Sequence, residues 1–260
     1  SVVIVNDAST EERPNTDINF KKIKSVRVMN MKKNRGHARC NATGLKYITE
    51  KENFDHVILM DGDGEDRPEE LTPLFDKSKE NPSKTVTLNR IKRSEGVFFK
   101  LLYEFHKILT YIFTGKLIKF GNYSCLPKED FTKLTKEACI WSSFSGSVTK
   151  VIPNRVSVPS TRGQRYFGPS QMNLFNLLIH SFSIIAVFKF SVFLRSAIFL
   201  IFIYFFRHQI GFLFFILIAL SLFIFNTLIL LTSFRENISE LNNSLENINN
   251  IDVLSDFNSR

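Results

Sequence analysis

Cysteine and tryptophan are both scarce in this sequence. The cysteines are Cys40, Cys125 and Cys139, and the single tryptophan is Trp141. The cysteines have neither the close spacing of a metal site nor the even number of a disulfide framework, which favours reduced thiols in a cytosolic domain. No internal repeat or low-complexity linker is present either, which excludes a repeat architecture.

Phenylalanine and positive charge are abundant but unevenly distributed. The 260 residues include 27 phenylalanines, and the formal net charge is +9. Charged residues are frequent up to about Arg165, and Phe, Leu and Ile dominate from there to Phe234. The first part suits one α/β domain and the second suits membrane-spanning helices. Most of the basic residues would lie on a solvated surface, and some could attract lipid headgroups or phosphorylated substrates. Nothing in their pattern indicates nucleic-acid binding.

Strand and helix patterns alternate in the first part, which predicts βαβ units in a mostly parallel sheet. Asp7 follows the first strand, and Asp61-Gly62-Asp63 follows the third. Ligands of open α/β sheets bind at the carboxyl ends of the strands, so these acids mark the expected site. The predicted strands are 2–5, 26–29, 56–60 and 85–88, and the predicted helices are 36–50, 68–79 and an aromatic-rich one at 95–118.

Two membrane spans are predicted in the second part. Residues 210–231 carry no charge and are long enough to cross the bilayer as a helix. Residues 192–206 are fewer and include Arg195, so this span requires Arg195 to snorkel to the interface or the helix to begin near Ser183. The short turn between the spans predicts a hairpin. Its open end has more flanking Lys and Arg than the turn, which predicts a cytoplasmic catalytic domain.

The most specific motif is the acidic turn from Asp61 to Glu69, Asp-Gly-Asp-Gly-Glu-Asp-Arg-Pro-Glu. Asp61 and Asp63 could share one Mg²⁺ or Mn²⁺ ion, with Glu65 as a further oxygen ligand. Such an ion would bridge a diphosphate and stabilise a departing nucleotide. A Ca²⁺-binding EF-hand is excluded, because positions six and twelve from Asp61 are Asp66 and Thr72 rather than Gly and Glu.

Asp7 is the second acid of the expected site. It precedes the polar turn Ala8-Ser9-Thr10, which suits contact with a nucleobase or ribose. Asp-x-Ser is also common in ordinary turns. The presence of the Asp61 cluster in the same predicted sheet favours the binding role.

These motifs resemble those of family 2 glycosyltransferases, in the branch of dolichol-phosphate mannose synthase and bacterial polyprenyl-phosphate glycosyltransferases. The similarity runs from Ser1 to about Phe188. Residues 6–10 resemble the family's Asp-Asp-Gly-Ser-Thr turn, and residues 34–39 its Asn-x-Gly segment. Residues 60–69 resemble its Asp-x-Asp block, and residues 168–172 its Gly-x-Ser-Lys-Tyr segment.

The resemblance implies a GT-A fold with a bound metal ion and a nucleotide-sugar donor. Asp7, with Ser9, would contact the nucleotide. Asp61 and Asp63 would hold the ribose and the metal-diphosphate, and Glu65 would bind the metal. Three arginines are candidates for holding the phosphates of donor and acceptor, because guanidinium groups bind phosphate bidentately. They are Arg90, Arg93 and Arg165, of which Arg93 could equally be a surface residue.

The sequence departs from the family pattern in three places. The family's opening strand and its Pro-x-Tyr-Asn-Glu motif are absent. The chain begins at once in an apolar run with no initiator Met or signal peptide, so we expect that residues upstream of Ser1 supply them. Asn6 replaces the first Asp of its turn, and Gln171 and Met172 replace Lys and Tyr.

The acceptor predicted from these residues is a polyprenyl phosphate. Transfer to a hydroxyl requires a general base, and the only paired acids near the expected place, Glu129 and Asp130, are better explained as first-turn acids of a helix. A lipid phosphate is already anionic and needs no base. Two alternatives stay open: transfer to a glycan or glycolipid hydroxyl, and a non-catalytic membrane scaffold. A processive synthase would need a Gln-x-x-Arg-Trp motif, which the surroundings of Trp141 do not provide.

The domain organisation predicted from these features has four parts. They are a GT-A-like catalytic domain at 1–165, a membrane-proximal amphipathic segment at 166–190, two transmembrane helices at 191–234 and a polar tail at 235–260. In the tail, Ile238, Leu241, Leu245, Ile248 and Ile251 have a spacing that indicates a short amphipathic or coiled-coil helix. Association of the chain into a homo-oligomer is compatible with the sequence.

Overall fold

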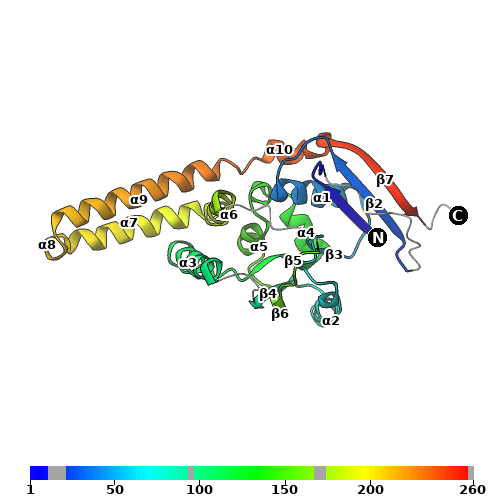
Figure 1. Cartoon of the computed structure of the whole chain (residues 1–260), viewed down its shortest axis with the longest axis horizontal. Coiled ribbons are helices and arrows are strands. Elements are labelled where there is room, and N and C mark those ends of the chain that lie inside the picture. Colours follow the sequence, from blue (N-terminus) through cyan, green and yellow to red (C-terminus); the bar gives the residue numbers. More distant parts are fainter. Residues whose placement is uncertain (11–21, 93–96, 167–173, 257–260) are drawn as a thin grey trace.

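The computed structural model describes residues 1–10, 22–92, 97–166 and 174–256 (Figure 1). Its strands are β1 (Val2–Asn6), β2 (Ser25–Met31), β3 (His56–Leu59), β4 (Val86–Lys92), β5 (Phe120–Pro127), β6 (Val156–Thr161) and β7 (Ile248–Asp256). Its α-helices are α1 (His37–Lys51), α2 (Leu71–Glu80), α3 (Val97–Thr114), α4 (Lys128–Leu134), α5 (Phe144–Val151), α6 (Leu174–Ala186), α7 (Lys189–Phe205), α8 (Arg207–Ile210), α9 (Phe212–Ser233) and α10 (Ile238–Asn242). Short 3-10 turns lie at Pro68–Glu70, Ala138–Trp141 and Ser244–Asn247.

The predicted strands and helices of the first part are confirmed. The four predicted strands correspond to β1–β4, and the three predicted helices to α1, α2 and α3. Apolar and β-branched residues form the strands because these side chains pack well on a pleated surface. Pro68 stands at the start of its 3-10 turn, where a missing N–H costs nothing.

The prediction of a mostly parallel sheet is wrong. The described strands form two mixed sheets, ordered β1-β2-β7 and β3-β5-β4-β6. The β1–β2 and β4–β6 pairs are parallel, whereas β2–β7, β3–β5 and β4–β5 are antiparallel. The antiparallel pairs all involve β5 or β7, neither of which the sequence predicted. Within the described residues β1 and β3 each pair on one side only; the expected upstream strand stays a prediction.

The C-terminal segment, residues 235–256, returns from the helical hairpin to the sheet (Figure 1). The helix predicted there is present only as α10, and β7 follows it as an antiparallel partner of β2. Residues 248–256 form a strand in spite of the helical spacing of their isoleucines. Pairing with β2 supplies hydrogen-bond partners for the main-chain groups along the outer edge of that strand. Leu241 of α10 is fully buried in the main core, so the segment is part of the domain.

The main core lies between the sheets and helices α1, α4 and α5. It contains Leu45, Leu126, Phe131 and Trp141, all at most 2% exposed. Trp141 is therefore a core residue. The three cysteines are free, and all three are buried.

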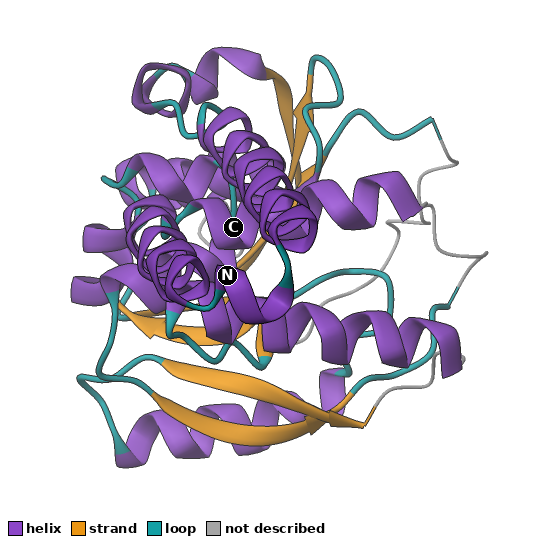
Figure 2. Ribbon diagram, turned by 90° about the vertical axis from the view of Figure 1, so that its left-hand side faces the viewer, coloured by secondary structure: helices purple, strands orange, loops and turns teal. Residues whose placement is uncertain are grey.

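Helices α7 and α9 lie side by side as an antiparallel hairpin (Figure 1), and Figure 2 views them end on. The helical stretch Phe212–Asn242 is long and apolar enough to cross a membrane. The 17-residue α7 is shorter, and the apolar pair that it forms with α6 is bent by 88°. The alternative of one continuous helix from Ser183 is therefore wrong. Arg195 of α7 donates to the carbonyl oxygen of Ile112 at the end of α3 (3.2 Å).

Candidate functional site

The acidic loop, residues 61–66, is folded by its own carboxylates. Asp66 Oδ2 accepts the main-chain N–H of Asp61 at 3.0 Å, and Asp63 Oδ1 accepts that of Glu65 at 3.0 Å. Gly64 has a φ of 89°, a backbone conformation that L side chains rarely adopt. The loop thus holds several acids next to one another at the end of β3.

Asp61 is held by side chains from two other elements. Its Oδ1 lies 3.0 Å from Nε2 of His37, the first residue of α1, and accepts from Nδ2 of Asn122 on β5 at 2.9 Å. Burial alone would raise the pKa of Asp61, but His37, Asn122 and Arg90 outweigh it and lower the pKa to about 2. The hydrogen bond with Asp61 in turn raises the pKa of His37. Asp61 is therefore a stable carboxylate.

Asp66 has the opposite electrostatics. It is only 5% exposed, and burial together with the negative charge of Asp61 raises its pKa to about 6. Arg90 on β4 is the nearest cation, with Nη2 3.8 Å from Asp66 Oδ1. Asp66 and Arg90 therefore hold the loop from its buried side, and the role of Arg90 in phosphate binding stays a prediction.

The arginine segment, residues 162–166, covers the acidic loop. The main-chain N–H of Gly163 donates to the carbonyl of Glu65 (2.8 Å), and that of Tyr166 to the carbonyl of Asp63 (3.0 Å). Arg162 forms an ion pair with Glu65, and Arg165 Nη1 lies 3.5 Å from Asp63 Oδ2.

Two details show how closely the arginine segment packs and what it offers a ligand. A Cβ on Gly64 would lie 2.7 Å from the ring of Tyr166, so only glycine fits beneath that ring. Nε of Arg165 is buried and has no hydrogen-bond partner in the described part of the chain. The segment therefore brings two guanidinium groups to the acids of the loop.

The three predicted metal ligands do not converge on one point in this arrangement. Asp61 faces His37 and Asn122, Asp63 faces Arg165, and Glu65 pairs with Arg162. Across the described ranges, no three His, Cys, Asp or Glu side chains are placed to hold an ion together. The carboxylates are instead balanced by side-chain cations.

The Asp7 turn is built differently. Asp7 Oδ1 accepts the main-chain N–H of Arg35 at 2.9 Å, and Oδ2 accepts that of Gly36 at 2.8 Å. Asp7 thereby fixes the loop that leads into α1. Ser9 is exposed, and its main-chain N–H donates to Asn6 Oδ1 at 3.0 Å. Ala8 between them has a φ of 54°.

A chain of side-chain hydrogen bonds connects this turn to the C-terminal segment. Asn6 Nδ2 donates to Asn30 Oδ1 at 3.0 Å, and Asn30 Nδ2 donates to Asp252 Oδ2 at 2.8 Å. The three residues lie on β1, β2 and β7, so the chain crosses the whole three-stranded sheet. The position of the Asp7 turn therefore depends on β7.

A family model, glycosyl transferase family 2, matches residues 1–146. The match includes both acidic turns, α1 and Asn122 of β5. The chain belongs to glycosyltransferase family 2. The family supports a glycosyltransferase that uses a nucleotide-sugar donor and an acceptor. No curated protein matches the chain.

In this glycosyltransferase, the helix-acid interpretation of Glu129 and Asp130 is confirmed. Both lie in the first turn of α4, where Glu129 pairs with Lys133 (2.7 Å) and Asp130 accepts from the hydroxyl of Thr85 (2.7 Å). Neither contacts the acidic loop. Arg93 and the predicted Gly-Pro-Ser segment at 168–172 lie outside the described residues.

Three residues of the site were missed in the sequence. His37 lies within the recognised segment at 34–39, and Arg162 begins the run Arg-Gly-Gln-Arg that ends at Arg165. Both residues lie in or next to motifs that the sequence analysis had selected, so their closeness to those motifs could have identified them as site residues. Asn122 lies in the unpredicted strand β5, and no pattern in the sequence distinguishes it.

Proposed function

We propose that this glycosyltransferase transfers a sugar from a nucleotide-sugar donor to a polyprenyl phosphate at the membrane surface. The observation that carries the proposal is the balance of charge at the acidic loop. Arg90, Arg162 and Arg165, together with His37, surround the carboxylates of residues 61–66. Guanidinium groups that now pair with carboxylates can turn to the phosphates of two anionic substrates.

The reaction that fits this site is a direct displacement. An oxygen of the acceptor phosphate forms a bond to the anomeric carbon of the sugar, while the bond from that carbon to the donor's diphosphate breaks. The electron pair leaves with the nucleoside diphosphate. No proton has to be removed from the acceptor. This agrees with a loop whose carboxylates all have partners among the described residues.

Arg165 is the residue we assign to incoming phosphate. Its buried Nε–H is unused in the described part of the chain, and its pairing with Asp63 at 3.5 Å is longer than a charged hydrogen bond. A phosphate oxygen would satisfy that donor. Arg162 would move with it, because both belong to the same segment.

Requirement for Mg²⁺ or Mn²⁺ stays a prediction from the family. The residues as arranged do not fit one ion jointly, since Glu65 is paired with Arg162. The displacement above is therefore written without a metal. A thermal-stability series with nucleoside diphosphates, each with and without Mn²⁺, tests the prediction. Stabilisation by one nucleotide only when Mn²⁺ is present supports it, and equal stabilisation without Mn²⁺ contradicts it.

Membrane anchoring by the α7–α9 hairpin is also part of the proposal. Apolar side chains of both helices point outward, including Phe190, Phe214 and Phe223, each more than 60% exposed. We propose that both helices span the bilayer, with the catalytic domain on the cytoplasmic side because most flanking Lys and Arg lie there. His208→Cys in the turn should react with an impermeant maleimide from outside intact cells. Lys51→Cys should react only after permeabilisation, and the reverse pattern would invert the proposed orientation.

The experiment that tests the proposed acceptor uses the full chain purified in detergent. A panel of nucleotide sugars is offered with a polyprenyl phosphate, and in parallel with the matching polyprenol, which differs only by the phosphate. We expect sugar transfer to the phosphate and none to the alcohol. Transfer to the polyprenol or to a glycan hydroxyl, without transfer to the lipid phosphate, would show that the acceptor is wrong while leaving the donor class intact.

A further inference from the structure

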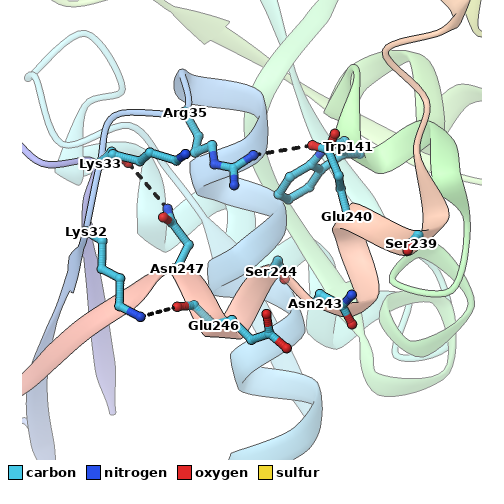
Figure 3. A pocket seen from close by; sticks show the side chains of 10 residues that line it. All are labelled: Lys32, Lys33, Arg35, Trp141, Ser239, Glu240, Asn243, Ser244, Glu246 and Asn247. Atoms are coloured by element: carbon cyan, nitrogen blue, oxygen red, sulfur yellow. Dashed lines mark hydrogen bonds and ion pairs between the residues drawn. The ribbon is translucent and has the colours of Figure 1, made fainter.

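A polar pocket of about 450 Å³ lies between the C-terminal segment and the loop that follows β2 (Figure 3). Lys32, Lys33 and Arg35 line one side, and the 3-10 turn Ser244–Asn247 lines the other. Its volume falls in the range of small-molecule sites, roughly 300–1,000 Å³. Of its lining residues only Arg35 belongs to a motif recognised in the sequence, and none belongs to the acidic loop.

The two walls of the pocket are joined by hydrogen bonds. The main-chain N–H of Lys32 donates to the carbonyl of Asn247 (2.7 Å), and Lys32 Nζ donates to the carbonyl of Glu246 (2.7 Å). Asn247 Nδ2 donates to the carbonyl of Lys33 at 3.3 Å (Figure 3). The pocket is therefore a built feature that depends on the C-terminal segment being in place.

The charged side chains that line the pocket carry a net positive charge. Glu240 is satisfied by Arg35 Nη1 at 3.4 Å and by the indole N–H of Trp141 at 3.0 Å. Lys32 and Lys33 then remain, with Glu246 as the one further acid of the lining, which leaves an excess of one positive charge. An anion would be attracted to such a site.

Two buried polar atoms in the lining have no partner in the described residues. They are the hydroxyl of Ser244, a residue only 3% exposed, and Nε of Arg35. Buried polar groups are nearly always hydrogen-bonded, so each such atom requires an explanation. A ligand that carries both an anionic group and hydroxyl groups would satisfy both atoms.

We propose that this pocket binds an anionic, hydroxyl-bearing small molecule of the sugar-phosphate class, separately from the donor site. Lys32, Lys33 and Arg35 hold the phosphate. The Ser244 hydroxyl and the Glu246 carboxylate hold sugar hydroxyls. The pocket adjoins the Asp7 turn through Arg35, whose main-chain N–H donates to Asp7. Ligand binding here therefore steadies both β7 and the Asp7 turn.

Isothermal titration calorimetry on the full chain in detergent tests the proposal, with glucose 1-phosphate, inorganic phosphate and glucose as probes. We expect glucose 1-phosphate to bind more tightly than either of its halves. Lys33→Glu should weaken its binding at least tenfold, since the substitution reverses a charge on the phosphate side of the pocket. Ser244→Ala should weaken it about threefold and leave phosphate binding unchanged.

Two variants serve as controls for this measurement. Lys51→Glu changes another exposed lysine, at the far end of α1, and should leave binding unchanged. Asp61→Asn alters the proposed donor site and should also leave it unchanged. If Asp61→Asn abolishes the binding and Lys33→Glu does not, the ligand occupies the donor site and the proposal is wrong. The proposal is equally wrong if glucose 1-phosphate does not bind at millimolar concentration, or if phosphate alone binds as tightly.

Discussion

The two acidic turns of the site differ in the kind of partner that holds their carboxylates. Both oxygens of Asp7 accept from main-chain N–H groups, those of Arg35 and Gly36. In the acidic loop, Asp66 and Asp63 also accept main-chain N–H groups, but Asp61, Asp63 and Glu65 each face a side-chain partner as well, namely His37, Arg165 and Arg162. A main-chain N–H can release a carboxylate only if the loop unfolds, whereas a side-chain cation can release it by changing its rotamer. The acidic loop is therefore suited to exchange partners with a substrate, and the Asp7 turn to hold its shape.

The sharpest test of this difference is Asp61→Asn. It removes the charge that His37 and Asn122 hold in place, and we expect kcat/KM for sugar transfer to fall about 100-fold or more, as for loss of a central electrostatic group. The protein should stay folded, because no main-chain group loses its partner. Asp76→Asn, an exposed acid on α2, is the matched control for the kinetic assay. Wild-type activity in Asp61→Asn would favour the non-catalytic scaffold.

Arg165→Gln and Arg162→Gln test whether the cations of the arginine segment serve the substrates. Each removes a charged hydrogen bond to phosphate, so we expect KM for donor or acceptor to rise about tenfold for each. Arg155→Gln is the control, since Arg155 donates to the carbonyl of Ile152 and lies away from the loop. If both site variants behave like Arg155→Gln in steady-state kinetics, the arginines only neutralise the acids.

Asp7→Ala examines the other turn. The main-chain N–H groups of Arg35 and Gly36 lose their carboxylate acceptor, which should lower the free energy of unfolding by about 1–2 kcal/mol, as when a helix cap is removed. Donor KM should rise less than for the arginine variants, because only the position of the loop changes. Chemical denaturation and steady-state kinetics on the same preparation give both values. A large rise in donor KM with unchanged stability would instead support direct contact of Asp7 with the nucleotide.

The smallest expected effect is that of Ala8→Gly. Ala8 has a φ of 54°, where the Cβ atom costs roughly 1–2 kcal/mol, partly offset by the greater backbone entropy of glycine. We expect the free energy of unfolding to rise by about 0.5–1 kcal/mol with transfer activity unchanged. A decrease in the denaturation midpoint would show that the turn is not strained at this position.

The sequence predicted those parts of the fold that depend on local pattern. Apolar runs indicated β1–β4, and Asp61 and Asp63 were recognised because they follow one such run. β7 was not predicted, since its isoleucines continue a helical spacing and only pairing with β2 decides its conformation. His37, Asn122 and Arg162 were missed for a similar reason. Each contacts a partner that is more than 20 residues away in the sequence. Residue spacing in the sequence does not predict contacts over such separations.

The position of β7 also sets the order in which the protein can mature. During synthesis at about 5–20 residues per second, β2 leaves the ribosome long before β7, with both hairpin helices made in between. Until residues 248–256 emerge, the outer edge of β2 is open to other extended chains, which is a known route to aggregation. If translation stalls within the hairpin, β7 is never made, and the nascent enzyme cannot complete its three-stranded sheet.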